Sequence, residues 1–215
     1  MSGIMLNLLG NTFGGAPVPI VGSAFGGGFF AGQISTTANG IATHNLVIGP
    51  ISTAQTTNRW RNVSGATPGA DSFIDGPQNT ADMVAHGNAT AYPCAHFCND
   101  LVIGGFSDWY MPARNELEVC YYNLKPTTAT NQPSSGINAN AVPARASNYS
   151  SGTPAQTSAS DFKDTGAEDF DQNDYWTSTE AGSSFAYTQY FDNGFQSDNG
   201  KTSIDRVRAV RRVAV

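Results

Sequence analysis

The sequence predicts an α+β fold in which short helices lie beside a mostly antiparallel sheet, preceded by an extended, glycine-rich N-terminal arm. Short apolar runs bounded by Gly, Asn and Pro, in both halves of the chain, predict the strands. One apolar stripe at helical spacing, near the middle of the chain, predicts the longest helix. We assign the arm to residues 1–30 and a single folded body to residues 31–215.

The arm consists largely of Gly, Phe and small apolar residues, without helical or strand periodicity. Ordering Gly costs backbone entropy, so a segment of this kind needs a surface on which to pack. Two arrangements satisfy this need. The arm anchors to a neighbouring subunit, or it folds back on its own domain.

Strand signals begin at residue 29. Apolar runs at 29–34 and 43–48 flank the dipeptide Asn39-Gly40, which favours a tight hairpin because both of its residues accept positive φ. Two short helices and a short strand are expected next, over residues 79–86 (capped by Asn79 or Thr80), 92–101 (with Pro93 in the first turn) and 108–111.

The clearest helix spans residues 113–124. Its apolar stripe recurs at i, i+3, i+4 and i+7, at Leu117, Cys120, Tyr121 and Leu124. Residues 126–160 are mostly Thr, Ser, Asn, Pro and Ala, and this composition predicts a long surface loop. Strands are expected after it, over residues 175–179, 185–191 and 204–213, with a turn at 192–194.

The composition excludes a nucleic acid as a partner and a helix that spans a membrane. The chain has 17 acidic and 11 basic residues and a net charge of −6, which offers no footprint for a nucleic-acid backbone. Its apolar runs are too short for a helix that spans a membrane. Only 13% of the residues are charged, a low share that is common in proteins of large assemblies, so we expect a homo-oligomer. Three cysteines are an odd number, which predicts a reducing compartment rather than a disulfide scaffold.

Cysteine and histidine offer one candidate metal site. Cys94, His96 and Cys98 fall close together, Cys120 could be a third ligand beside the two cysteines, and no fourth ligand is evident. On a helix, His96 would point away from the face that the two cysteines share. We therefore interpret the thiols as small buried hydrophobic groups.

Three separated blocks carry a resemblance to a known family. They are GGFSDWYMPARNELE (residues 104–118), YWTSTE (175–180), and QYFDNGFQ followed by VRAVRR (within 189–212). In this order they resemble a domain of phage tail proteins and of the C-terminus of collagen-like bacterial adhesins. The resemblance implies a C-type-lectin-like fold, similar to that of the formylglycine-generating enzyme.

The same resemblance implies a function. It predicts a virion protein of the tail or tail fibre, assembled in the host cytoplasm, that attaches to a host-surface glycan or protein. The arm would then bind other virion proteins. The alternative is a purely structural virion subunit, such as a capsid decoration or collar protein. The chain has no cysteine after Cys120, whereas the formylglycine-generating enzyme uses cysteines late in its domain, so we expect no enzyme activity.

Residues 183–202 are the predicted ligand-binding face, because related receptor-binding proteins use this region. Aromatic rings stack on sugars, and amides and carboxylates bond their hydroxyls. The candidate residues are Tyr187, Gln189, Tyr190, Asp192, Asn193, Phe195, Gln196, Asp198 and Asn199. Alternation along a strand would turn about every second one into the core.

Calcium is the one cofactor that the resemblance suggests. Asp169, Asp171, Asn173 and Glu180 have the spacing of an EF-hand loop, but Asp174 stands where that loop needs Gly. C-type lectins often hold calcium with loop carboxylates, so Asp169, Asp171 and Asp174 are the candidate ligands. The alternative interpretation is a solvated acidic loop.

Six residues in the family blocks are assigned structural roles: Trp109, Glu116, Trp176, Glu180, Arg208 and Arg211. The tryptophans are expected to anchor the core. A buried arginine needs a partner. We therefore expect Glu116 or Glu180 to pair with Arg208 or Arg211.

Overall fold

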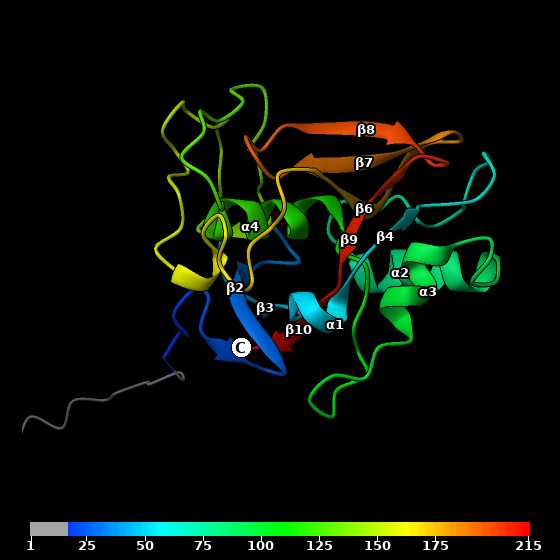
Figure 1. Ribbon diagram of the computed structural model, residues 1–215, viewed down its shortest axis with the longest axis horizontal. Helices are drawn as coiled ribbons and strands as arrows, with labels where there is room; N and C mark the ends of the chain where they lie inside the picture. Colours follow the sequence, from blue (N-terminus) through cyan, green and yellow to red (C-terminus); the bar gives the residue numbers. More distant parts are fainter. Residues whose placement is uncertain (1–16) are drawn as a thin grey trace, which may run out of the picture.

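The computed structural model describes residues 17–215, which form two five-stranded sheets and several short helices (Figure 1). The first sheet is antiparallel and has the order β1-β2-β3-β10, with β5 beside β2. Its strands are Ala24–Phe25 (β1), Gly28–Ile34 (β2), His44–Ile48 (β3), Ala141–Val142 (β5) and Val210–Ala214 (β10).

The second sheet has the order β4-β9-β6-β7-β8. Neighbouring strands run antiparallel except β6 and β9, which are parallel. Its strands are Gln55–Arg59 (β4), Asp174–Gly182 (β6), Phe185–Tyr190 (β7), Gln196–Gly200 (β8) and Ile204–Arg208 (β9). Short helices beside mostly antiparallel sheets confirm the predicted α+β class.

One C-terminal segment contributes to both sheets. The sequence predicts a single strand over residues 204–213, but this segment divides at Ala209 into β9 and β10. Ala209 N donates a hydrogen bond to Ala54 O (2.9 Å), and Ala209 O accepts one from Gly49 N (2.9 Å). These bonds to another part of the chain hold the crossing point between the two sheets, which strand periodicity alone does not reveal.

The helices are α1 (Ile51–Ala54), α2 (Gly76–His86), α3 (Pro93–Asn99), α4 (Arg114–Leu124) and a 3₁₀ turn, η1 (Ser160–Phe162). The predictions of α2, α3 and α4 are confirmed, although α2 begins earlier than expected, with Pro77 in its first turn. Asn79 does not cap α2. Its amide nitrogen instead donates to Ser72 O (2.7 Å) and lies 3.2 Å from Ser178 Oγ. Within residues 17–215, no helix has the length and apolar character needed to cross a bilayer.

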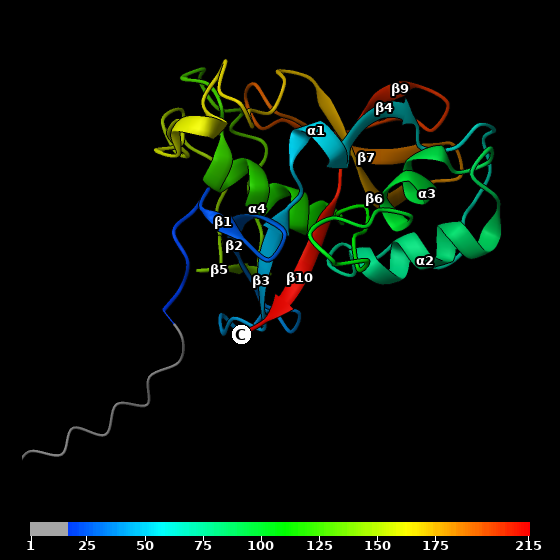
Figure 2. The same ribbon diagram turned by 60° about the horizontal axis from the view of Figure 1, so that its bottom comes forward.

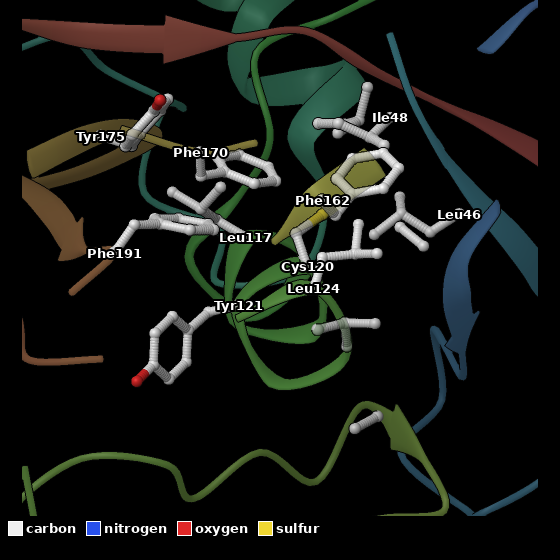
Figure 3. Close-up of a cluster of buried hydrophobic side chains, with 14 of the residues drawn as sticks. Leu46, Ile48, Leu117, Cys120, Tyr121, Leu124, Phe162, Phe170, Tyr175 and Phe191 are labelled. Carbon is white, nitrogen blue, oxygen red and sulfur yellow. The ribbon is translucent and has the colours of Figure 1, made fainter. Parts of the chain in front are cut away.

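Helix α4 packs against both sheets, with contacts to β2 in the first and to β6 and β7 in the second. Its predicted stripe lies in one apolar cluster with residues of β3 and a group of aromatic side chains (Figure 3). Phe170 stacks on Phe191 with ring centroids 3.9 Å apart. This core therefore fixes the position of α4 relative to the β6–β7 hairpin.

Helices α2 and α3 lie together at one end of the molecule (Figure 2), and residues of both belong to a second apolar cluster. Trp109 and Trp176 both belong to it and are 2% and 0% exposed. Trp109 Nε1 donates to Phe106 O (3.1 Å) and Trp176 Nε1 to Asn58 O (3.1 Å). Both tryptophans therefore have the predicted anchoring role, with each indole N–H satisfied.

Three local predictions differ from the structure. The hairpin of β2 and β3 forms, but residues 35–43 connect it instead of a two-residue turn, and positive φ occurs at Ala38 and Gly40 rather than at Asn39. Asn39 Oδ1 instead accepts from Ile41 N (3.0 Å). Residues 108–111 form only an isolated bridge between Tyr110 and Val210.

The segment 126–160 is not simply a surface loop. Asn131 and Asn138 are 2% and 1% exposed. Asn131 accepts a hydrogen bond from the buried Lys125 Nζ (2.7 Å), and Asn138 donates to the Asn115 backbone oxygen (2.8 Å). Polar groups can be buried when they bond one another, so a polar composition does not by itself identify a surface segment.

The described part of the predicted arm, residues 17–30, includes β1 and the start of β2. These strands belong to the first sheet, and Gly22 N donates to Phe30 O (2.8 Å). Residues 1–16 lie outside the described residues. The anchoring role of the arm therefore stays a prediction.

Candidate functional site

The predicted ligand-binding residues lie on two opposite faces of the β7–β8 hairpin. Pairing sets Tyr187 opposite Asp198 and Gln189 opposite Gln196, so these four side chains share one face, here called the Tyr187 face. The other side, the Tyr190 face, carries Thr188, Tyr190, Ser197 and Asn199. The predicted binding site therefore combines residues from both faces.

The turn between the two strands holds Asp192, Asn193 and Phe195. Asn193 Oδ1 accepts from Phe195 N (3.0 Å), and Asp192 O accepts from the Thr127 hydroxyl (2.8 Å). The Asn193 side chain therefore shapes the turn itself. Phe195 is 39% exposed beside it.

A cation stacked between two aromatic rings borders the Tyr187 face. The Arg114 guanidinium carbon lies 5.1 Å from the ring centroid of Phe73 and 5.2 Å from that of Tyr187. The two rings are 5.3 Å apart and nearly perpendicular, at 79°. Phe73 is 41% exposed, so the stack reaches the surface. Burial lowers the pKa of Arg114, and the loss of hydration strengthens its attraction to the rings.

Buried polar atoms without partners gather beneath this stack. Among residues 17–215, five buried side-chain polar atoms lack a hydrogen bond, and three of them are Arg114 Nε, Gln189 Oε1 and Gln196 Nε2. Native proteins bond nearly all such atoms. These three therefore mark a place where a water or a ligand group completes the hydrogen bonding.

The other polar atoms of this cluster are used internally. Gln196 Oε1 accepts from Arg114 Nη2 (3.3 Å) and from Gly136 N (3.3 Å). Gln189 is only 1% exposed, and its Nε2 donates to Gly194 O (2.7 Å). Gln189 therefore lies under the site instead of on its surface. Arg114 and Phe73 are the members that the sequence analysis missed, although Arg114 stands inside the first family block.

The segment 126–160 supports this face from the side. Glu118 on α4 is fully buried and forms an ion pair with Arg145. Tyr149 donates a hydrogen bond to Glu118 Oε1 (2.8 Å), and the Arg145 guanidinium lies 4.1 Å from the ring centroid of Tyr122. These contacts hold the segment that presents Gly136 to the Tyr187 face, and they border a cavity of about 390 Å³.

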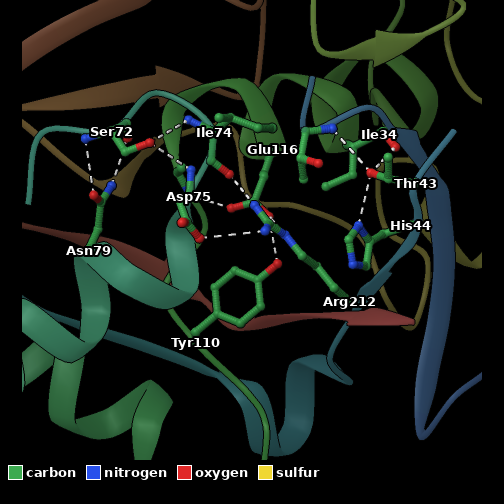
Figure 4. A network of polar contacts seen from close by, with 12 residues as sticks. Ile34, Thr43, His44, Ser72, Ile74, Asp75, Asn79, Tyr110, Glu116 and Arg212 are labelled. Atoms are coloured by element: carbon green, nitrogen blue, oxygen red, sulfur yellow. Dashed lines mark hydrogen bonds and ion pairs between the residues drawn. The ribbon is translucent and has the colours of Figure 1, made fainter. Parts of the chain in front are cut away.

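A second network of polar contacts holds α4 against β10 (Figure 4). Arg212 Nε lies 2.8 Å from Glu116 Oε1, which also accepts from the Tyr110 hydroxyl (2.5 Å). Glu116 Oε2 accepts from Ala113 N (2.8 Å), and Arg212 Nη1 lies 3.5 Å from Asp75 Oδ1. Burial lowers the pKa of Arg212, but Glu116 and Tyr110 outweigh it and raise the pKa above its usual value.

The predicted carboxylate–arginine pairs are wrong. Glu116 pairs with Arg212, and Glu180 pairs with the buried Lys201. Arg208 pairs with Glu168, and Arg211 pairs with Asp108. The division of the C-terminal segment at Ala209 is the physical reason, because it changes which side of the chain each arginine faces. All six residues that were predicted to have structural roles are buried or partly buried in the fold.

The predicted calcium ligands do not converge. Asp169 Oδ2 accepts from Thr165 N (2.9 Å), Asp171 Oδ2 lies 2.5 Å from Arg206 Nε, and Asp174 lies on the Tyr190 face. In the part of the chain that the structure describes, no three His, Cys, Asp or Glu side chains form a group able to hold a metal. The three members of the loop make separate local contacts, and calcium binding by this loop stays a prediction.

The cysteines do not form a shared site either. Cys94 and Cys98 belong to the second apolar cluster and Cys120 to the first, and all three are buried and free. Burial raises the pKa of each thiol. His96 Nε2 lies 2.8 Å from Gly87 O. The thiols are therefore small core groups.

Comparison with known proteins gives one family match. Residues 52–211 match the family model of the Lcl C-terminal domain. No curated protein matches the chain. A fimbrial protein from Bacteroides ovatus ATCC 8483 is similar in structure, with a TM-score of 0.43 and 14% sequence identity. The alignment covers 81% of this chain and 36% of the fimbrial protein, so the chain spans about a third of that protein's length.

These findings correct the predicted identity. The matched family is the Lcl C-terminal domain, over residues 52–211, so the assignment to the phage tail and collagen-like adhesin family is wrong. The descriptions as a virion protein and a tail-fibre protein, and the virion location, are wrong for the same reason. The α+β class is confirmed, and the finer C-type-lectin-like fold is not.

Proposed function

The chain belongs to the Lcl C-terminal domain family, and we propose that this member is a non-catalytic recognition domain whose Tyr187 face binds a glycan. One observation carries the proposal. Three buried polar atoms without partners, on Arg114, Gln189 and Gln196, lie beneath a surface stack of two aromatic rings and a guanidinium.

The chemistry of this face suits a neutral, hydroxyl-rich ligand. Arg114 Nε and Gln196 Nε2 are donors, and Gln189 Oε1 is an acceptor. The rings of Phe73 and Tyr187 offer apolar contact beside them. A sugar presents an apolar ring face for the two aromatic rings and hydroxyls that both donate and accept, and a bound water would link it to Gln189 beneath.

Several groups that could perform catalysis have structural contacts instead. Glu116, Glu118 and Glu180 are each in an ion pair. Burial of the three cysteines raises the pKa of each thiol and opposes formation of the thiolate, which is the nucleophilic form. This arrangement supports a binding role rather than catalysis.

A glycan array with the whole chain tests the proposal. We expect Gln196→Ala and Tyr187→Ala to weaken binding to the retained glycans by about tenfold or more, which corresponds to the loss of one or two good contacts. Ser197→Ala is the matched control, because Ser197 is next to Gln196 on the opposite face of β8. Thermal unfolding of each variant checks that the fold is retained.

Two results would contradict this function. The first is binding that Gln196→Ala and Tyr187→Ala leave unchanged, which would place the glycan elsewhere. The second is the absence of glycan binding together with a stable oligomer that Tyr187→Ala dissociates in light scattering. That result would favour a structural subunit whose Tyr187 face packs against a neighbouring copy.

A further inference from the structure

Four strands of the second sheet bring polar side chains into one row on the Tyr190 face. Antiparallel pairing sets Asn58 of β4 opposite Asp205 of β9, and Asp174 of β6 opposite Tyr190 of β7. The parallel register of β6 and β9 then places Asp174 beside Asp205. These two aspartates come from positions 31 residues apart in the sequence, which the order of the strands brings together.

This pair lacks the cationic partners that other enclosed carboxylates have. Glu116, Glu118 and Glu168 each pair with an arginine. Over residues 17–215, neither Asp174 nor Asp205 forms an ion pair. Both are half-buried. Like charges side by side on a sheet repel each other, so a bound cation would stabilise this arrangement.

A second feature independently points to a ligand at the same place. Thr188 of β7 is 1% exposed, and its Oγ1 is buried without a hydrogen bond. This hydroxyl lies beside the Asp174 carboxyl, and the Asn199 amide nitrogen is oriented toward the same carboxyl as a donor. Asn199 Nδ2 also donates to Asp205 Oδ2 (3.0 Å), so the amide of Asn199 holds both carboxyls in place. The row therefore presents side-chain oxygen atoms from three strands, β6, β7 and β9.

The electrostatics agree with this geometry. Burial raises the pKa of Asp174, and the neighbouring Asp205 raises it further. Burial also raises the pKa of Asp205, although Asn199 and Arg206 oppose the shift. The Arg206 guanidinium is already engaged by Asp171, with Nε 2.5 Å from Oδ2. The carboxyls of Asp174 and Asp205 are thus short of positive charge.

We propose that Asp174 and Asp205 together bind a calcium ion, with the Thr188 hydroxyl as a neutral ligand and water as the remainder. Calcium accepts six to eight oxygen ligands in a flexible geometry, which suits ligands from different strands. With two carboxylates only, the expected dissociation constant is about 0.1–1 mM, as in weak extracellular calcium modules. The ion would join β6, β7 and β9 and remove the repulsion within the pair.

Thermal unfolding of the whole chain with and without calcium provides the first test. About 10 mM CaCl₂ is expected to raise the Tm by about 3–10 °C relative to NaCl of equal ionic strength, and MgCl₂ to raise it less. Asp174→Asn and Asp205→Asn should lose this calcium-dependent shift. Both variants should also have a higher Tm than the unaltered chain without calcium, because each removes the repulsion.

Asp198→Asn is the matched control, because Asp198 is an exposed aspartate of β8 on the opposite Tyr187 face. It should keep the full calcium-dependent shift. A second measurement does not depend on stability. Trp176 lies two residues from Asp174 on the same face of β6, so Tb³⁺ bound at the pair should show tryptophan-sensitised emission that Ca²⁺ displaces.

Several outcomes would overturn the proposal. One is a Tm that calcium leaves unchanged, together with no sensitised Tb³⁺ emission. Another is a calcium-dependent shift that persists in Asp174→Asn and Asp205→Asn, which would place the ion elsewhere. An equal shift with MgCl₂ would overturn the assignment to calcium. This proposal is independent of glycan binding, since the two sites lie on opposite faces of the hairpin.

Discussion

At the scale of single residues, neighbouring arginines on β10 bind carboxylates on opposite sides of the chain. Arg211 is bidentate to Asp108, with Nε–Oδ1 at 2.7 Å and Nη2–Oδ2 at 2.9 Å. Arg212 points to α4 and pairs with Glu116, which is fully buried. The Arg211 pair reaches solvent through Asp108, whereas the Arg212 pair is enclosed, so the second should matter more for stability.

We expect Arg212→Met to lower the free energy of unfolding by about 3–5 kcal/mol, because it leaves the Glu116 carboxylate buried without its cation. Urea unfolding at neutral pH measures this. Glu116→Gln combined with Arg212→Met should recover part of the loss, since Gln keeps an acceptor for the Tyr110 hydroxyl. A double variant as unstable as the sum of the two single variants would show that the pair is not coupled.

At the scale of elements, one glycine fixes the turn that joins β7 and β8. Gly194 has φ +77°, and a Cβ built there would lie 2.3 Å from the ring of Tyr121. Its carbonyl also accepts the hydrogen bond from Gln189 Nε2. The close packing of this turn on α4 therefore depends on the absence of a side chain at residue 194.

Gly194→Ala is expected to destabilise the protein by more than Gly40→Ala. Gly40 has nearly the same φ, +78°, but a Cβ there meets nothing within 4 Å. Gly40→Ala therefore measures only the loss of stability from placing alanine at positive φ, about 1 kcal/mol. The additional loss in Gly194→Ala measures the clash with Tyr121. Equal losses in urea unfolding would contradict the steric explanation.

Periodicity in the sequence predicted the elements that bury one apolar face. The stripe of α4 was visible because its apolar residues recur every three or four positions. The division at Ala209 was not visible, since it depends on backbone bonds to Gly49 and Ala54, far away in the sequence. The burial of Asn131 and Asn138 was missed for a similar reason, because their partners are other polar groups.

The candidate site was predicted only in part. The family blocks pointed to the β7–β8 hairpin, and Tyr187 and Gln196 lie on the face that we propose binds a ligand. Sequence alternation could not show which of the two faces meets Arg114, because that contact comes from the packing of α4. The pairing of Asp174 with Asp205 likewise depends on the order of strands in the sheet.

At the scale of the whole molecule, the C-terminal segment joins the two sheets and the helices into one unit. Strand β9 lies inside the second sheet, and β10 forms an edge of the first. Side chains of this segment also form ion pairs with residues before and after α4, including Asp108 and Glu168. The two sheets should therefore unfold together rather than in separate transitions.

Removal of residues 209–215 is expected to abolish cooperative unfolding, because it deletes β10 and the two arginines Arg211 and Arg212. Near-UV circular dichroism during heating measures the loss of fixed aromatic packing. Removal of Val215 alone is the control, since this residue is 63% exposed and should change the Tm little. A sharp transition in the longer truncation would show that one sheet folds without the other.

The enclosure of Cys94, Cys98 and Cys120 has a practical consequence for labelling. These are all the cysteines of the chain, and burial both shields them and disfavours the thiolate that reacts with maleimides. A cysteine introduced at a solvent-facing position is then the single reactive group in the native protein. Fluorophores or surface couplings can therefore be placed at chosen points without first replacing any native residue.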